Sequence, residues 1–287
     1  MKTLFLLLTL AVSLCAQQRL RVLAIGAHPD DCDIKFGGTA ALFAQMGHVV
    51  KFLSVTNGDA GHHEMGGGPL ARRRYLETQE SLKRLGIEEY QVLDNHDGEL
   101  TPSLEIRRQI IRVIREWKAD IVITHRTNDY HPDHRNTGIL VQDAAYMVVV
   151  PNVVSGTPAL VKNPVFLYYS DNFQQPNKFT PDIVVDIDST YEKKIDGMDA
   201  HVSQFYEWLA FVDGRLAEVP KDPKARREWL KSRRPFGISP VARAVAEKWY
   251  GRERAAKIKY AESFEIGEYG RRPGDEEIKR LFPMLGK

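Results

Sequence analysis

Short apolar segments alternate with amphipathic segments through the first two thirds of this 287-residue chain. Helical spacing of apolar residues occurs over residues 37–46, 70–85 and 103–117. Runs typical of buried strands lie before, between and after these helices, at residues 21–27, 49–55, 90–93, 121–124, 165–169 and 183–187. Because strands that alternate with helices pair as parallel neighbours, this order predicts an α/β fold. We expect a Rossmann-like three-layer arrangement with a mostly parallel sheet and helices on both faces.

The pattern becomes mainly helical beyond Asp188. Residues 196–209 and 241–257 have helical character, and prolines interrupt the chain between them. We therefore expect a main domain over residues 19–210 and a helical C-terminal elaboration of the same domain over residues 211–287. The basic run at 221–234 is expected to be a solvated surface.

Residues 1–16 have the pattern of a secretory signal peptide. Lys2 precedes an apolar run over residues 4–14, and two small residues then precede a polar pair. A helix that spans a membrane needs roughly 20 apolar residues, so no stable membrane span is expected. The pattern predicts a secreted or periplasmic protein, and the large Leu14 argues against a lipid anchor at Cys15. A buried first strand is the alternative, which the abrupt polar break after the apolar run disfavours.

Overall charge and cysteine content narrow the possible partners and crosslinks. The formal net charge is +2, which provides no strong field for nucleic acid or an anionic membrane, so neither is expected as a partner. Removal of the signal peptide leaves Cys32 as the remaining cysteine, which excludes an intramolecular disulfide. The fold must then be stabilised by its core, and the pattern does not indicate an oligomeric state.

Two polar clusters follow the first and fourth predicted strands. His28-Pro29-Asp30-Asp31 ends the first strand, and the fourth is followed by His125 and then by His131-Pro132-Asp133-His134. In the common strand order 3-2-1-4-5, strands one and four flank the crevice where ligands bind, at the carboxyl ends of the strands. The two clusters, about a hundred residues apart in the sequence, are therefore expected to meet in space.

The residue types in these clusters are those of a zinc site. Imidazole and carboxylate suit Zn²⁺, and a catalytic zinc keeps three protein ligands and one open position. His28, Asp31 and His134 can supply the three ligands. The first strand is not followed by G-x-G-x-x-G, and carboxylates stand where a pyrophosphate needs glycines. A dinucleotide there would meet negative charge, so the fold alone does not indicate a dehydrogenase.

Three further residues of the clusters have side chains suited to catalysis. Asp30 can take a proton from a zinc-bound water, whose pKa the ion lowers to around 7. His131 can stabilise an oxyanion or protonate a leaving amine. Asp133 can hold one of the histidines in the required tautomer.

These motifs resemble the hallmarks of the LmbE/PIG-L family of zinc-dependent N-deacetylases. The first hallmark, A-H-P-D-D followed by Gly-Gly-Thr, stands at residues 27–31 and 37–39, and the second, H-P-D-H, at residues 131–134. The similarity continues through a threonine-glycine-acid-glycine loop and an arginine-bearing helix to His-Val-Ser-Gln at 201–204, and so covers residues 21–204.

The resemblance implies a role for each residue of the paired motifs. It implies His28, Asp31 and His134 as zinc ligands and Asp30 as general base. It also implies His131 as the electrophilic partner of an amide carbonyl, with Asp133 as its orienter.

Further positions are implied as substrate contacts or depart from the family pattern. Arg74 and Asp97 are implied substrate contacts, with a solvated helix face and a turn residue as the alternatives. Asp129 stands where some members carry a tyrosine two residues before H-P-D-H. The extra His62 and His63 lie in a glycine-rich loop, for which we expect a mobile, exposed position rather than the pocket mouth.

The function these residues predict is zinc-dependent hydrolysis of an acetamide. The substrate would be an N-acetylated sugar or a related small amide, and the products acetate and a free amine. A metal-dependent phosphoesterase is an alternative, although that chemistry often uses two metals and more bridging acids. A non-catalytic secreted sugar-binding protein is the third possibility, but such a protein is expected to have lost Asp30 or a ligand, and none is lost.

Overall fold

The computed structural model describes residues 19–233 and 236–286. The predicted signal peptide, residues 1–16, lies outside the described residues. Within the described ranges, no helix combines the length and the apolar character needed to cross a membrane.

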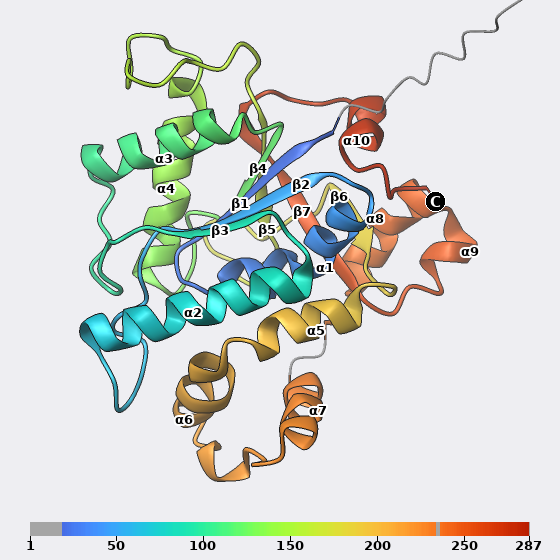
Figure 1. Cartoon of the computed structure of the whole chain (residues 1–287). Coiled ribbons are helices and arrows are strands. Elements are labelled where there is room, and N and C mark those ends of the chain that lie inside the picture. Colours follow the sequence, from blue (N-terminus) through green and yellow to red (C-terminus); the bar gives the residue numbers. More distant parts are fainter. Residues whose placement is uncertain (1–18, 234–235, 287) are drawn as a thin grey trace, which may run out of the picture.

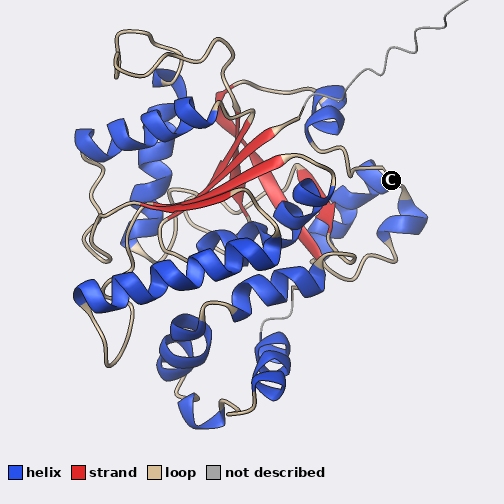
Figure 2. Cartoon of the chain, viewed as in Figure 1, coloured by secondary structure: helices blue, strands red, loops and turns tan. Residues whose placement is uncertain are grey.

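A seven-stranded sheet forms the centre of the described structure (Figures 1 and 2). Its strands follow the order β3-β2-β1-β4-β5-β7-β6, which contains the predicted order 3-2-1-4-5. The first five pair in parallel, and β7 is antiparallel to both of its neighbours. The strands are β1 (Arg21–Gly26), β2 (Val49–Ser54), β3 (Glu89–Val92), β4 (Ile121–Thr124), β5 (Val165–Tyr169), β6 (Ile183–Asp186) and β7 (Ala261–Gly270). The predicted α/β class with a mostly parallel sheet is confirmed.

Helices cover both faces of this sheet (Figure 1). The helices of the main layers are α1 (Asp31–Gln45), α2 (Gly67–Leu85), α3 (Leu104–Trp117), α4 (Pro132–Met147) and α5 (Tyr191–Asp199). The C-terminal part adds a π-helical segment (Ser203–Trp208), α6 (Leu209–Val212), a 3-10 turn (Leu216–Glu218), α7 (Pro223–Arg233), α8 (Pro240–Tyr250), α9 (Arg252–Ala255) and α10 (Asp275–Leu281).

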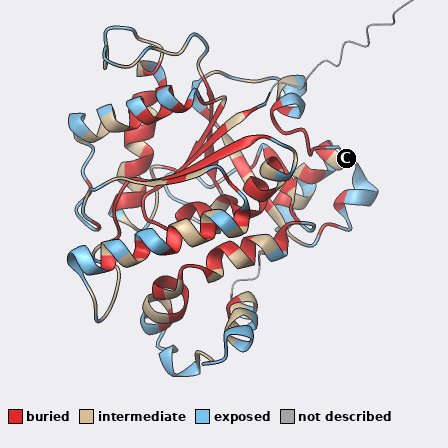
Figure 3. Ribbon diagram, viewed as in Figure 1, coloured by how far each residue is buried: buried red, intermediate tan, exposed pale blue. Residues whose placement is uncertain are grey.

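Alternate side chains of β1 build the two halves of the core. Val22 and Ala24 belong to the cluster that includes α1, whereas Leu23 and Ile25 belong to the cluster that includes α3 and α4. All four side chains are fully buried, because a parallel strand at the centre of a sheet is covered on both faces. Figure 3 shows the same burial along most of the sheet.

Helix boundaries follow local signals in the sequence. α1 begins at Asp31, earlier than the predicted residue 37, and its first turn carries Asp31 and Asp33, which interact favourably with a helix N-terminus. Ser103 caps α3 by accepting a hydrogen bond from the N–H of Ile106. α2 ends at Gly86, whose left-handed φ of 75° is accessible to glycine without strain.

The C-terminal part is mainly helical, as predicted, and also supplies the strand β7, which the sequence pattern does not predict. Glu262 on β7 is buried, and its carboxylate accepts hydrogen bonds from the N–H groups of Gly38 (3.0 Å) and Thr39 (2.8 Å) on α1. Its Oε1 also lies 2.6 Å from Nζ of Lys194 on α5, which is equally buried. Glu262 thus joins the added strand to two helices of the main layer.

Glu262→Ala should destabilise the protein by about 3 kcal/mol or more, since it leaves a buried lysine charge without its partner. Glu268→Ala is the matched control on the same strand, because Glu268 is 82% exposed and its ion pair with Arg272 is a surface pair. Denaturant unfolding of the two variants measures the difference. Equal free energies of unfolding would contradict the assigned role of Glu262.

Candidate active site

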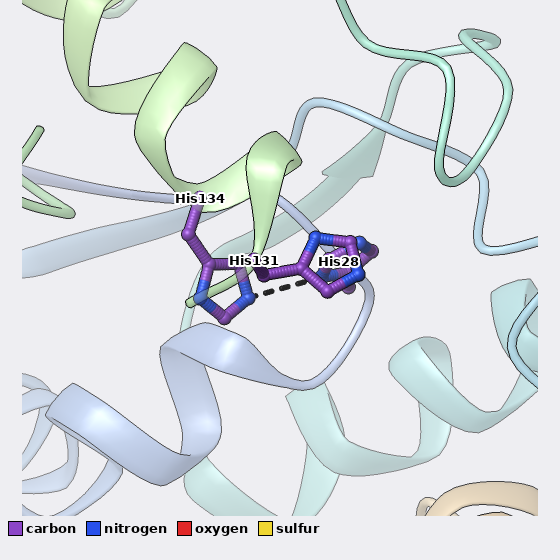
Figure 4. A group of neighbouring side chains, drawn as sticks. All are labelled: His28, His131 and His134. Atoms are coloured by element: carbon purple, nitrogen blue, oxygen red, sulfur yellow. Dashed lines mark hydrogen bonds between the residues drawn. The ribbon is translucent and has the colours of Figure 1, made fainter. Parts of the chain in front are cut away.

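The site forms where the carboxyl ends of β1 and β4 lie side by side. These strands pair in parallel, with Val22 opposite Ile121 and Ala24 opposite Ile123. The loops that follow them therefore emerge together. His28 and His134, 106 positions apart, face each other with Nδ1 of the first 3.2 Å from Nε2 of the second (Figure 4).

Three side chains with atoms that can bind a metal converge between the loops that follow β1 and β4. Nδ1 of His28 and Nε2 of His134 are 3.2 Å apart, and Asp31 approaches them with Oδ2 at 3.5 Å and Oδ1 at 3.4 Å respectively. Tetrahedral zinc with ligands at 2.0–2.2 Å places its ligand atoms about 3.4 Å from one another. The structure brings the predicted ligands His28, Asp31 and His134 together at about this spacing, with a different oxygen of Asp31 nearest to each histidine.

The opposite ring nitrogen of each facing histidine lies against carboxylate. Nε2 of His28 lies 3.0 Å from Oδ1 of Asp97 and 3.3 Å from Oδ2 of Asp133. Nδ1 of His134 lies 3.1 Å from Oδ1 of Asp129. A carboxylate on the far nitrogen is the usual support of a metal-binding histidine, because it sets the tautomer and the ring orientation. The facing nitrogens of both histidines are thus left available for a shared ion.

His125 and His131 also lie close enough to be considered as ligands. Ring nitrogens of His131, His28 and His134 fall within 4.8 Å of one another, as do donor atoms of His125, Asp31 and His134. Nδ1 of His131, however, accepts the N–H of Asp133 at 3.2 Å, and Nε2 of His125 accepts the N–H of Ala27 at 3.2 Å. Burial lowers the pKa of His125 to about 4, so it stays neutral behind Asp31.

The carboxylate of Asp133 contacts His28 rather than His131, the partner that the family resemblance implies. Its carboxylate accepts hydrogen bonds from the N–H groups of Gly98 (2.7 Å) and Leu100 (3.3 Å) and contacts His28, whereas only its backbone N–H contacts His131. That backbone contact makes His131 the N-cap of α4. Because Nδ1 of His131 accepts a hydrogen bond, the proton of the neutral ring belongs on Nε2.

Arg74 is buried rather than solvated, and it joins two carboxylates. Its Nη2 lies 3.3 Å from Oδ1 of Asp30, and its Nη1 lies 3.4 Å from Oδ2 of Asp97. Nη1 also donates to the carbonyl oxygen of Gly58 at 3.1 Å. Gly58 has a φ of +72°, and a Cβ there would lie 2.5 Å from the guanidinium, so only glycine fits beside Arg74.

The buried carboxylates differ in their electrostatic surroundings. Burial raises the pKa of Asp30, and Arg74 only partly offsets this effect. Burial also acts on Asp97, but the hydrogen bond and charge of His28 outweigh it and lower the pKa of Asp97 to about 2. The pKa of His131 is lowered by burial and by the neighbouring histidines. Asp30 is therefore the carboxylate of this group with the greater tendency to hold a proton.

These side chains open into a pocket of about 530 Å³. Seven of the eight predicted site residues line it, and the fully buried Asp133 lies behind the lining. The π-helical segment contributes Gln204 and Trp208 to the wall, and Gln204 donates to the carbonyl oxygen of Gly61 at 3.1 Å. The seven residues are His28, Asp30, Asp31, Arg74, Asp97, His131 and His134.

The expectation of an exposed position for His62 and His63 is wrong. Their side chains are only 3% and 10% exposed. Nε2 of His62 lies 2.9 Å from Glu207, His62 stacks on His63, and His63 stacks on Phe211 at 4.4 Å between ring centroids. Contacts with residues far along the chain therefore hold this glycine-rich loop against the C-terminal helices.

Fold and site define the class of protein: an α/β protein with a cluster of histidines and carboxylates, able to hold a metal ion, at the carboxyl ends of its parallel strands. The sequence profile of the PIG-L family, described as GlcNAc-PI de-N-acetylase, matches residues 23–145. A diacetylchitobiose deacetylase of Thermococcus kodakarensis is 34% identical over 197 residues, which cover 65% of this chain and 71% of that protein. The chain belongs to the PIG-L family of deacetylases, which are hydrolases acting on N-acetyl amide bonds.

Two further relatives match larger shares of this chain. A probable N-acetyl-alpha-D-glucosaminyl L-malate deacetylase of Bacillus cereus is 26% identical over 220 residues, 73% of this chain and 94% of the relative. The structure of N,N′-diacetylchitobiose deacetylase from Pyrococcus horikoshii is 27% identical, with a TM-score of 0.63, and the match covers 86% of this chain and 83% of that one. The shared fold thus includes much of the C-terminal part.

Asp129→Ala should weaken zinc binding about tenfold or more, because loss of a carboxylate behind a metal-binding histidine typically has this effect. Chelator competition measures the affinity. Asp143→Ala, on the exposed side of α4, is the control and should bind zinc like the wild type. Equal affinities in the two variants would show that Asp129 does not support His134.

Proposed function

We propose that this protein hydrolyses the acetamide of an N-acetylated sugar or a related small amide in a zinc-dependent reaction. The observation that carries the proposal is the convergence of His28, Asp31 and His134 at 3.2–3.5 Å, beside Asp30 in the same pocket. Membership of the PIG-L family, with relatives named deacetylases, supports the amide as substrate.

The donor set fits zinc, because two imidazoles and one carboxylate leave a fourth tetrahedral position open. Zinc bound by these three residues supplies a water of lowered pKa and polarises the carbonyl of the substrate. The chain's other site residues must then position the reactants and move the protons.

Asp30 serves as the general base. Its Oδ1 is held by Nη2 of Arg74 at 3.3 Å, and among the described residues Oδ2 makes no hydrogen bond. Arg74 thereby fixes the orientation of the carboxylate and leaves Oδ2 available for a water molecule. Asp30 takes a proton from the attacking water, and the same proton can pass to the nitrogen that leaves as the amine.

His131 serves as a hydrogen-bond donor to the acetamide oxygen. Its Nδ1 is occupied by the N–H of Asp133, so Nε2 carries the proton. Its ring lies at the pocket lining, 4.6 Å from the ring of His28. A donor fixed in this way stabilises negative charge that develops on the carbonyl oxygen during attack.

The alternatives are less well supported. A phosphoesterase with two metals needs bridging carboxylates between ions about 4 Å apart, whereas Asp97, Asp129 and Asp133 instead contact the outer nitrogens of the histidines. A non-catalytic sugar-binding protein would have no use for a buried Arg74 that orients Asp30. Release of acetate rather than phosphate would exclude the phosphoesterase. Measurable turnover would exclude the non-catalytic sugar-binding protein.

Asp30→Asn should keep its zinc but lose about 10²–10⁴-fold in kcat, because the ligands remain and the base is removed. His134→Ala should lose both zinc and activity. Acetate release and zinc content per protein chain are the measurements, with Asp143→Asn as the control. Full turnover by zinc-loaded Asp30→Asn would refute the role of Asp30, and full turnover after zinc removal would refute the metal dependence.

The site of action is a separate proposal, which rests on the N-terminal pattern alone. We propose that the protein is exported and that its signal peptide is cleaved after Ala16. Mass spectrometry of the protein expressed with its full N-terminus should then find a chain that begins at Gln17. An intact N-terminus that stays in the cytoplasm would contradict export.

A further inference from the structure

Carboxylates outnumber cationic side chains on the lining of the pocket. The described lining residues include two cations, Lys35 and Arg74. They include five carboxylates, those of Asp30, Asp31, Asp97, Asp129 and Asp171. A bound divalent cation would still leave this lining without net positive charge. The electrostatic field of the pocket is therefore unfavourable for a substrate that carries a negatively charged group in addition to its acetamide.

The cations near the pocket are already engaged. Arg74 lies between Asp30 and Asp97, and Nζ of Lys35 donates to the carbonyl oxygen of Ser170 at 2.9 Å. Arg126, next to the lining, makes a two-point contact with Asp171, with distances of 2.6 and 2.7 Å. Recognition of a phosphate or carboxylate usually uses an arginine fork. The forks of Arg74 and Arg126 face carboxylates of the protein, and Nη1 of the neighbouring Arg135 donates to the carbonyl oxygens of Asp129 (2.7 Å) and Tyr130 (3.0 Å).

Aromatic side chains form another part of the lining. Tyr130 is 73% exposed, and its ring centroid lies 6.4 Å from that of Phe173; both line the pocket, as does Trp208. Tyr130 directly precedes His131, and its ring lies edge-on to the rings of His131 and His134 at 5.7 and 5.8 Å. An exposed aromatic face provides apolar contact area with a polar tip, which suits the C–H face of a sugar ring.

We propose that the pocket takes an uncharged N-acetylated saccharide, and that Tyr130 holds the sugar ring beside the reacting acetamide. The proposal rests on the deacetylase function proposed above and narrows its substrate class. The carboxylate-rich lining disfavours acidic N-acetyl sugars, and the aromatic ring supplies the binding contact that an ion pair would otherwise provide.

Substrate pairs that differ in charge test the first part. Acetate release from N-acetylglucosamine methyl glycoside and N,N′-diacetylchitobiose is compared with that from N-acetylglucosamine 6-phosphate and N-acetylmuramic acid. We expect kcat/KM at low ionic strength to be about tenfold or more higher for the neutral substrates, with a gap that narrows as salt screens the lining. Equal or higher values for the acidic sugars would overturn the proposal. Absence of acetate release from all four would instead count against the deacetylase function.

Two substitutions test the role of Tyr130. Tyr130→Ala should raise KM for the neutral saccharide about five- to tenfold with little change in kcat, whereas Tyr130→Phe should retain the wild-type KM because the ring face is kept. Tyr146→Ala, at an exposed position of α4 outside the pocket lining, is the matched control. An unchanged KM in Tyr130→Ala would contradict the contact. Equal loss of kcat in both Tyr130 variants would show that the hydroxyl acts in the chemistry instead.

Discussion

The whole site depends on the parallel pairing of β1 with β4. Neither strand carries a catalytic side chain within its paired residues, but their register sets where the two following loops emerge. Since β1 is buried on both faces, a slip of one residue would exchange the side chains that pack in the two core layers, and this packing therefore specifies the register. The close approach of His28 to His134 is a consequence of that packing, and the apolar core thus provides the precision with which the polar groups meet.

Much of the fold could be predicted because apolar periodicity is a local property of the sequence. The five parallel strands and α3 lie close to their expected positions. The strand β7 could not be predicted in this way, because its sequence, AESFEIGEYG, places charged Glu262 on a buried side, where Lys194 and two N–H groups compensate it. The expected helix at 241–257 is divided at Gly251, whose φ of 76° ends α8 and begins α9. Partners far along the chain decide the first case, whereas the glycine that divides the helix is a local signal.

In the candidate site, too, the sequence motifs could be placed in advance, whereas contacts with residues distant in the sequence could not. The spacing of the motifs was sufficient to place His28, Asp31 and His134 together, because that inference needed only strand order. The partners of the outer histidine nitrogens were not predictable, since Asp97 and Asp129 come from loops whose paths the sequence does not specify. For Asp129 a weak signal existed, as an acid just before H-P-D-H. The stack of His62 and His63 on the half-exposed Phe211 likewise depends on the position of the C-terminal helices.

The π-helical segment at Ser203–Trp208 brings a late part of the chain to the wall of the pocket. The zinc-ligand candidates and Asp30 all lie within residues 23–145, whereas Phe173, Gln204 and Trp208 lie beyond that stretch. One part of the pocket wall is thus formed by residues outside the stretch that carries the candidate ligands and Asp30. Substitutions at these later positions can therefore alter the pocket wall while the candidate ligands and Asp30 stay in place.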